Sequence, residues 1–293
     1  MGDLPALWSA EAADAQRAHA RHLRRWAAFG SSLAALVAGL LVGCGDHDSG
    51  PAPRSAVSAV PTPSPREIVV AAFDRTVKAR SLGFAEQVVV HGGGRELAVS
   101  ASGAADLGHR TVAMTLTRPG AGSIDLRSVG GALYVKSPYL AQQAGVRKPW
   151  LVVPVSAPTE IAGSFAGFEP AKVLAQARGL VPADVQETGT AEVRGAAMTR
   201  VRAKIGAQRL AGLSLLGQAG LGGAGLTGLR ENVPVDLYAD SQGFLRRVLI
   251  ILRLPGGATA AVVADFFAVN EPVSVDAPPA GDVAAGGDFL HGG

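Results

Sequence analysis

The strongest constraint on the fold is a two-residue alternation of apolar and polar side chains between residues 82 and 136. An alternation of this period is typical of antiparallel strands that bury one face. Glycine-containing turns interrupt the run at short intervals. The apolar side chains that share one face are Val112, Met114, Leu116, Ile124 and Leu126. We therefore predict a meander of antiparallel strands over residues 82–136.

A helix is predicted directly before this meander. Ser64 is a typical N-cap, Pro65 suits the first helical position, and Glu67 completes a capping box. Apolar residues then follow at helical spacing, so we expect an amphipathic helix over residues 65–80.

The second half of the chain adds a short helix and further strands. The strand at 244–254 carries apolar side chains on both faces, so we expect both faces to be partly covered. The predicted elements are a helix at 168–178, a hairpin of 185–194 with 198–205, and strands at 233–239, 244–254 and 258–267. These patterns predict an α+β protein with a large curved antiparallel sheet wrapped around helices and one concave apolar face. Residues 281–293 are expected to form a disordered tail.

The N-terminal segment has the order of a secretory signal. Four arginines between positions 17 and 25 precede an apolar run from Trp26 to Val42. The residues Leu41-Val42-Gly43-Cys44 resemble a bacterial lipobox, in which the cysteine is lipidated and begins the mature chain. We therefore predict a signal peptide over residues 1–43 and an acyl or diacylglycerol anchor on Cys44. The alternative is a transmembrane helix, because the apolar run approaches the roughly 17 residues that spanning requires.

Residues 44–64 are interpreted as the lipidated cysteine and a flexible tether, since the segment is rich in proline, serine and glycine. It contains Asp46-His47-Asp48, a possible metal-binding triplet. A flexible tether does not supply the fixed geometry of a tight metal site, so we assign these side chains to the tether.

Composition excludes several classes of function. The single cysteine excludes an intrachain disulfide and a cysteine-based zinc site. The net charge is only +3, and four of the arginines belong to the leader, so no basic stripe is left for a nucleic acid. The chain has no G-x-S-x-G motif, and we expect neither an enzyme nor a cofactor.

Several weaker features are given ordinary interpretations. The G-x-G-x-x-G matches at 220–225 and 223–228 lack the strand and helix that a dinucleotide site needs. Residues 206–228 are expected to form either a mobile cover over a cavity or a common surface loop. We expect three solvated histidines, namely His91, His109 and His291. Arg246 and Arg247 are expected to protect a hydrophobic strand from aggregation, or alternatively to meet a lipid headgroup.

Five short phrases of this sequence resemble a known family. They are Gly130-Gly131-Ala132-Leu133-Tyr134-Val135-Lys136, Lys148-Pro149-Trp150-Leu151, Val235-Asp236-Leu237-Tyr238-Ala239-Asp240, Gly243-Phe244-Leu245-Arg246-Arg247 and Asn270-Glu271-Pro272-Val273. Together with the lipobox and the tether, they are similar to the LppX, LprG and LprA type lipoproteins of actinobacteria, which have a LolA-like fold. The resemblance covers about residues 65–280. It implies an incomplete β-barrel closed by helices around an apolar cavity that takes lipid acyl chains.

The resemblance implies a membrane-anchored lipoprotein that carries or chaperones a lipid or lipoglycan across the cell envelope. The alternative is a lipid-anchored sensor or accessory protein that regulates a membrane protein, and a hydrolase is a remote third. The expected partners are a lipid or glycolipid, the cytoplasmic membrane, at whose outer face the anchor holds the protein, and an envelope transporter. The candidate cavity residues are Val112, Met114, Leu116, Ile124, Leu126, Val248, Ile250 and Phe266. Each of them could equally pack a closed core.

Overall fold

The computed structural model describes residues 63–118, 122–143, 145–154, 170–183, 185–210 and 232–285. The predicted signal peptide, Cys44 and nearly all of the tether therefore lie outside the described residues, as do both glycine-rich matches and His291. Residues 60–293 form a compact unit of their own. None of the described helices is long and apolar enough to cross a membrane.

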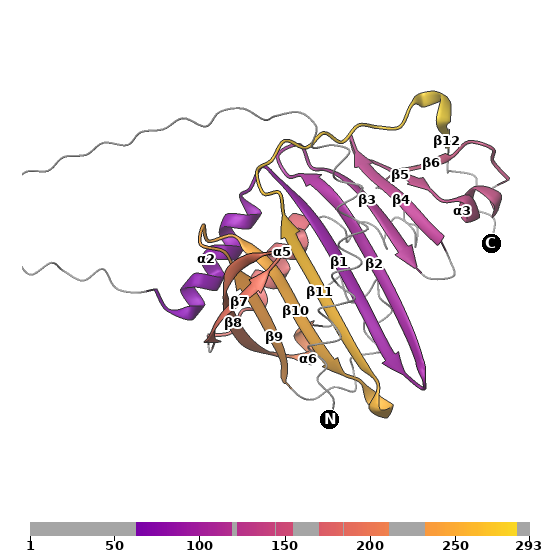
Figure 1. Ribbon diagram of the computed structural model, residues 1–293. Helices are drawn as coiled ribbons and strands as arrows, with labels where there is room; N and C mark the ends of the chain where they lie inside the picture. The colour runs from indigo at the N-terminus through magenta and orange to yellow at the C-terminus, as the bar shows by residue number, and fades with distance from the viewer. Residues whose placement is uncertain are drawn as a thin grey trace, which may run out of the picture. The chain divides into compact units, whose positions relative to one another are not determined.

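The described part of the chain is dominated by strands (Figure 1). In chain order these are β1 (Ser81–Gly92), β2 (Arg95–Asp106), β3 (Thr111–Arg118), β4 (Gly122–Val129), β5 (Ala132–Lys136), β6 (Trp150–Pro154), β7 (Val185–Val193), β8 (Ala196–Gly206), β9 (Asn232–Ala239), β10 (Leu245–Arg253), β11 (Thr259–Phe267) and β12 (Val283–Ala285). The helices are α2 (Pro65–Val77), α3 (Pro138–Gln143), α5 (Pro170–Leu180) and α6 (Ala207–Leu210), with 3-10 turns at Pro255–Gly257 and Ala280–Asp282.

All of these strands belong to one sheet. Its order is β12-β6-β5-β4-β3-β2-β1-β11-β10-β9-β8-β7, so that β12 and β7 are the edges within the described residues. Every neighbouring pair is antiparallel except β12 with β6, which is parallel. Figure 1 shows the curved surface that these strands form. The predicted meander is confirmed as β1 to β5, and the predicted hairpin as β7 and β8.

The opening helix α2 begins where the sequence predicts. The Ser64 side chain accepts a hydrogen bond from the Glu67 backbone N–H, and the Glu67 carboxylate accepts one from the Ser64 backbone N–H at 2.7 Å. The helix ends at Val77, three residues before the predicted end. Its buried positions are Val69, Ala72, Phe73 and Thr76, which follow the spacing of one helix face.

A β-bulge in β10 changes which residues face the core. The register of β10 against β9 shifts between Leu245 and Arg247. Leu245 is therefore almost fully buried in the main core, although strict alternation places it on the other face with Arg247. Its backbone N–H donates to Thr76 Oγ1 at 2.9 Å, which ties the bulge to helix α2.

The main core lies on one face of the sheet, which we call the inner face. Helix α2 contributes Phe73 to it, α5 contributes Leu174, and α6 contributes Leu210. Helix α2 packs on α5 and contacts β7, β9 and β10. The described buried residues of this core lie between Val69 and Phe266, within the compact unit of residues 60–293.

The C-terminal segment is more ordered than the sequence suggests. Residues 283–285 form strand β12 and pair with β6, so the predicted disordered tail is corrected for residues 281–285. Lys148 Nζ donates to the Val283 carbonyl at 2.8 Å, and Arg127 donates to the Asp276 carbonyl at 2.9 Å. These contacts attach the segment beyond β11 to the far end of the sheet.

Candidate functional site

The structure brings all eight candidate cavity residues to the inner face. Strand pairing places Met114 opposite Leu126 and Leu116 opposite Ile124. In β10, Val248 and Ile250 point to the same face, opposite Ala264 and Val262 of β11. All eight belong to the main core or pack against it. Their burial divides them into two groups. Five are buried, namely Val112, Met114, Leu126, Ile250 and Phe266, and three are partly exposed, namely Leu116, Ile124 and Val248.

The buried group behaves as core. Phe266 pairs with Phe84, which is followed across the sheet by Gly103, Met114 and Leu126. Gly103 has no room for a side chain, because a Cβ there would lie 2.2 Å from the Ala113 carbonyl oxygen. The strands are thus closely packed along the line from Phe266 to Leu126.

The partly exposed group falls on one line across the sheet, which we call the Glu86 row. Consecutive register partners from β10 to β4 make up this row: Val248, Ala264, Glu86, Ala101, Leu116 and Ile124. Neighbouring strands lie about 4.8 Å apart, so the row extends over about 24 Å. The apolar side chains at its two ends keep part of their surface exposed on the inner face.

Glu86 is the functional candidate that sequence reasoning missed. It occupies an inner-face position of β1, in line with Leu82, Phe84 and Val88. The sequence itself indicates this position, because a two-residue alternation that starts at Leu82 places residue 86 on the apolar face. Burial raises the pKa of the Glu86 carboxyl from its ordinary value of 4.5 to about 7. The side chain nevertheless keeps partial exposure, between a buried alanine on each neighbouring strand.

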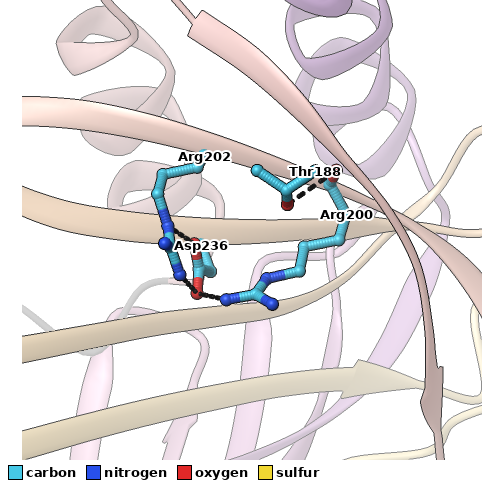
Figure 2. Close-up of polar contacts among 4 residues, drawn as sticks. All are labelled: Thr188, Arg200, Arg202 and Asp236. Carbon is cyan, nitrogen blue, oxygen red and sulfur yellow. Dashed lines mark hydrogen bonds and ion pairs between the residues drawn. The ribbon is translucent and has the colours of Figure 1, made fainter.

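The opposite, outer face carries charged side chains in pairs. Asp236 of β9 is held by two arginines of β8 (Figure 2). Arg202 binds it through two hydrogen bonds of 2.6 and 2.8 Å, and Arg200 donates to the same carboxylate. Burial favours a higher pKa for Asp236, but the hydrogen bonds from Arg202 and Arg200 outweigh it and hold that pKa below its usual range. This carboxylate is therefore ionised, and both of its oxygens accept hydrogen bonds from the two arginines.

Arg246 and Arg247 have carboxylate partners that the sequence analysis did not assign. Arg247 binds Asp265 through two hydrogen bonds of 2.6 and 2.9 Å, and Arg194 approaches the same carboxylate at 3.3 Å. Arg246 binds Asp240 at 2.6 Å. Strand protection and headgroup contact both stay predictions for these arginines. Their role here is to hold β10 to β11 and to the turn before β10.

The two described histidines also have partners that the sequence analysis did not assign. His109 Nδ1 lies 2.8 Å from Asp106, and His91 Nδ1 lies 3.3 Å from Glu96. The hydrogen bond that His109 donates to the Asp106 carboxylate raises the pKa of His109, although the ring is largely exposed. Both pairs join neighbouring or hairpin-linked residues at the ends of β1 and β2. They stabilise turns and do not form a site.

The described residues contain no group of three or more histidine, cysteine, aspartate or glutamate side chains that could hold a metal ion. The predicted cover at 206–228 is described only as far as residue 210. There the chain leaves β8, forms α6, and buries Leu210 in the main core. The remaining residues of the predicted cover lie outside the described ranges.

No protein-family model matches this chain, and no curated protein sequence matches it. Several solved structures are similar to it. LppX of Mycobacterium tuberculosis is 17% identical, with a TM-score of 0.48 over 72% of this chain and 98% of that protein. LprF of Mycobacterium bovis is 12% identical, with a TM-score of 0.45 over 74% and 98%. NE2245 of Nitrosomonas europaea, a LolA superfamily protein, is 10% identical, with a TM-score of 0.24 over 74% and 96%. LppX is of the lipoprotein type that the sequence resembles.

Proposed function

We propose that this protein is an envelope lipoprotein that binds a lipid or lipoglycan by its acyl chains on the inner face of the sheet and carries or chaperones it across the cell envelope. The observation that carries the proposal is the Glu86 row, where partly exposed apolar side chains lie in line on the core side of the sheet. The lipobox motif supports the envelope location independently. The proposed activity makes and breaks no covalent bond.

The hydrophobic effect supplies the affinity in this proposal. Each methylene group that leaves water for an apolar surface contributes about 0.8 kcal/mol. A long acyl chain therefore needs no specific polar anchor in order to bind. The partly exposed side chains that offer such a surface are Leu116, Ile124 and Val248.

The experiment is native mass spectrometry of residues 60–293, produced in the source organism or a close relative, followed by organic extraction. We expect a bound lipid of defined mass. Ile124→Glu should abolish binding because it places a charge on the apolar row. Ile251→Glu is the matched control, since Ile251 lies on the outer face of β10 and is 52% exposed. The control should retain the lipid.

A lipid-free protein that also fails to bind added phospholipid or glycolipid would overturn the carrier function. The sensor or accessory function would then be tested by crosslinking the anchored chain to membrane proteins in cells. Equal lipid binding by Ile124→Glu and Ile251→Glu would move the site away from the inner face.

We further propose that Cys44 carries an acyl or diacylglycerol anchor, which holds the protein at the outer face of the cytoplasmic membrane. Stable anchoring requires two acyl signals, and a diacylated cysteine satisfies this condition. The mature chain should then begin at Cys44 and carry the added mass of the acyl groups on that residue. Mass spectrometry of its N-terminal peptide measures both.

A further inference from the structure

Glu86 stands at the centre of the inner face with apolar surface on both sides. Val248 lies two strands away in one direction and Leu116 two strands away in the other, each at about 10 Å. The direct neighbours of Glu86 in the row are Ala101 and Ala264, whose methyl groups are too short to cover the carboxyl. A polar group is therefore accessible between two apolar stretches.

This carboxyl has no partner within the described part of the protein. No hydrogen bond or ion pair joins it to another described residue, and burial alone accounts for its shifted pKa. The adjoining inner-face positions of β2, β3, β10 and β11 are uncharged: Val99, Ala101, Gly103, Leu116, Val248, Val262, Ala264 and Phe266.

Among the described side chains of α2 and α5, the charged ones have other partners. Asp74 of α2 pairs with Arg178 of α5, and Arg75 donates to the Gln242 carbonyl. Arg66 donates to the Pro182 carbonyl at 3.3 Å. The Glu86 carboxyl is partly exposed and has no protein partner among the described residues, so it is available to exchange a hydrogen bond with a bound ligand in place of water.

We propose that Glu86 contacts the bound lipid, and that this lipid carries a free hydroxyl group between its acyl chains. The inference rests on the proposed function and names the class of its ligand. A hydroxyl group both donates and accepts, which matches a carboxyl in either protonation state. An acyl chain alone would leave the carboxyl unsatisfied. A phosphate at this position would place a second negative charge beside it.

The test measures lipid transfer to residues 60–293 from phosphatidylcholine vesicles that contain a trace of labelled lipid. The first probe is dioleoylglycerol, which has a free hydroxyl. The second is its O-methyl ether, which has the same chains and no hydroxyl hydrogen. The third is dioleoylphosphatidic acid, which is anionic. One hydrogen bond of ordinary net strength predicts an about fivefold preference for dioleoylglycerol over the ether.

Ionisation of Glu86 adds a signature that a structural role would not produce. A neutral carboxyl can donate to the ether oxygen, whereas a carboxylate cannot. The preference for dioleoylglycerol should therefore increase from pH 6 to pH 8. Glu86→Gln should show a preference that does not change with pH, and Glu86→Leu should show none. Gln87→Leu, on the opposite face of the same strand, should behave as the wild type.

Three results would overturn this inference. Equal preference in the wild type and Glu86→Leu, with transfer intact, would remove Glu86 from the site and leave the proposed function standing. A stronger transfer of the ether or of phosphatidic acid would show that the ligand class is wrong. Absence of transfer of any probe to the wild type and to every variant would overturn the proposed function together with the inference.

Discussion

At the scale of single residues, the two faces of the sheet treat carboxylates in opposite ways. On the outer face, Asp236 has two arginine partners, which keep it ionised. On the inner face, Glu86 has an apolar environment, which favours its neutral form. The first arrangement holds strands together. The second leaves a group whose protonation changes near neutral pH, which is the property expected of a residue that contacts a ligand.

The raised pKa of Glu86 makes stability depend on pH. Below pH 4.5 the carboxyl is protonated in both the folded and the unfolded chain, so ionisation has no effect there. Between its ordinary value of 4.5 and about 7, the unfolded chain releases the proton and the folded chain retains it. The free energy of unfolding therefore falls as pH rises through this window. The shift corresponds to a penalty of up to about 3 kcal/mol above pH 7.

We predict that Glu86→Gln removes this penalty. In urea unfolding of residues 60–293, the variant should be more stable than the wild type at pH 8, by up to about 3 kcal/mol. The difference should vanish near pH 4.5. Glu187→Gln is the control, because Glu187 is exposed on β7, and it should change stability little at either pH. A Glu86→Gln variant with the same stability difference at both pH values would contradict a buried, titrating carboxyl.

At the scale of elements, the sequence predicts those helices and strands that a local residue pattern specifies. The alternation in residues 82–136 and the capping box at Ser64 specify the meander and the start of α2, and both are confirmed. The bulge at Leu245 could not be predicted, because its unpaired N–H is satisfied by Thr76, which lies 169 residues away in sequence. Strand β12 was missed for a similar reason, since its strand partner within the described residues is β6, about 130 residues earlier in the chain.

The contact between α2 and the bulge gives the element-scale prediction. Thr76 Oγ1 accepts from the Leu245 N–H at 2.9 Å and donates to the Ala72 carbonyl at 2.8 Å. Thr76→Val keeps the shape but leaves the Leu245 N–H buried without an acceptor. We expect a loss of about 1–3 kcal/mol of unfolding free energy, measured by urea denaturation. The same substitution at the exposed Thr117 should have a much smaller effect. Equal effects at both positions would show that the hydrogen bond to the bulge contributes nothing.

At the scale of the whole molecule, the sheet is predictable, and the surface proposed to face the lipid is only partly so. Alternation identifies which side chains share the inner face, and all eight candidates lie there. Alternation does not separate Met114, which is buried, from Leu116, which is partly exposed, because both have the same periodicity. That difference depends on which side chains of distant elements cover each position. Glu86 was overlooked because the candidate set was restricted to apolar residues.

The predicted signal peptide and lipobox lead to the last prediction. If Leu41 to Cys44 function as a lipobox, the wild-type chain in cells loses residues 1–43 and gains acyl groups on Cys44. Cys44→Ser should keep those residues and gain no acyl mass, which intact mass spectrometry of the membrane fraction measures. Ser49→Ala, in the tether, should be processed as the wild type. A transmembrane segment at 26–42 gives a different result, with wild type and variant both at full length and without acyl groups. In either case the inner-face residues of the sheet lie at position 82 or later in the chain. Cys44→Ser should therefore leave lipid binding unchanged. This result would show that the anchor and the binding site are separate.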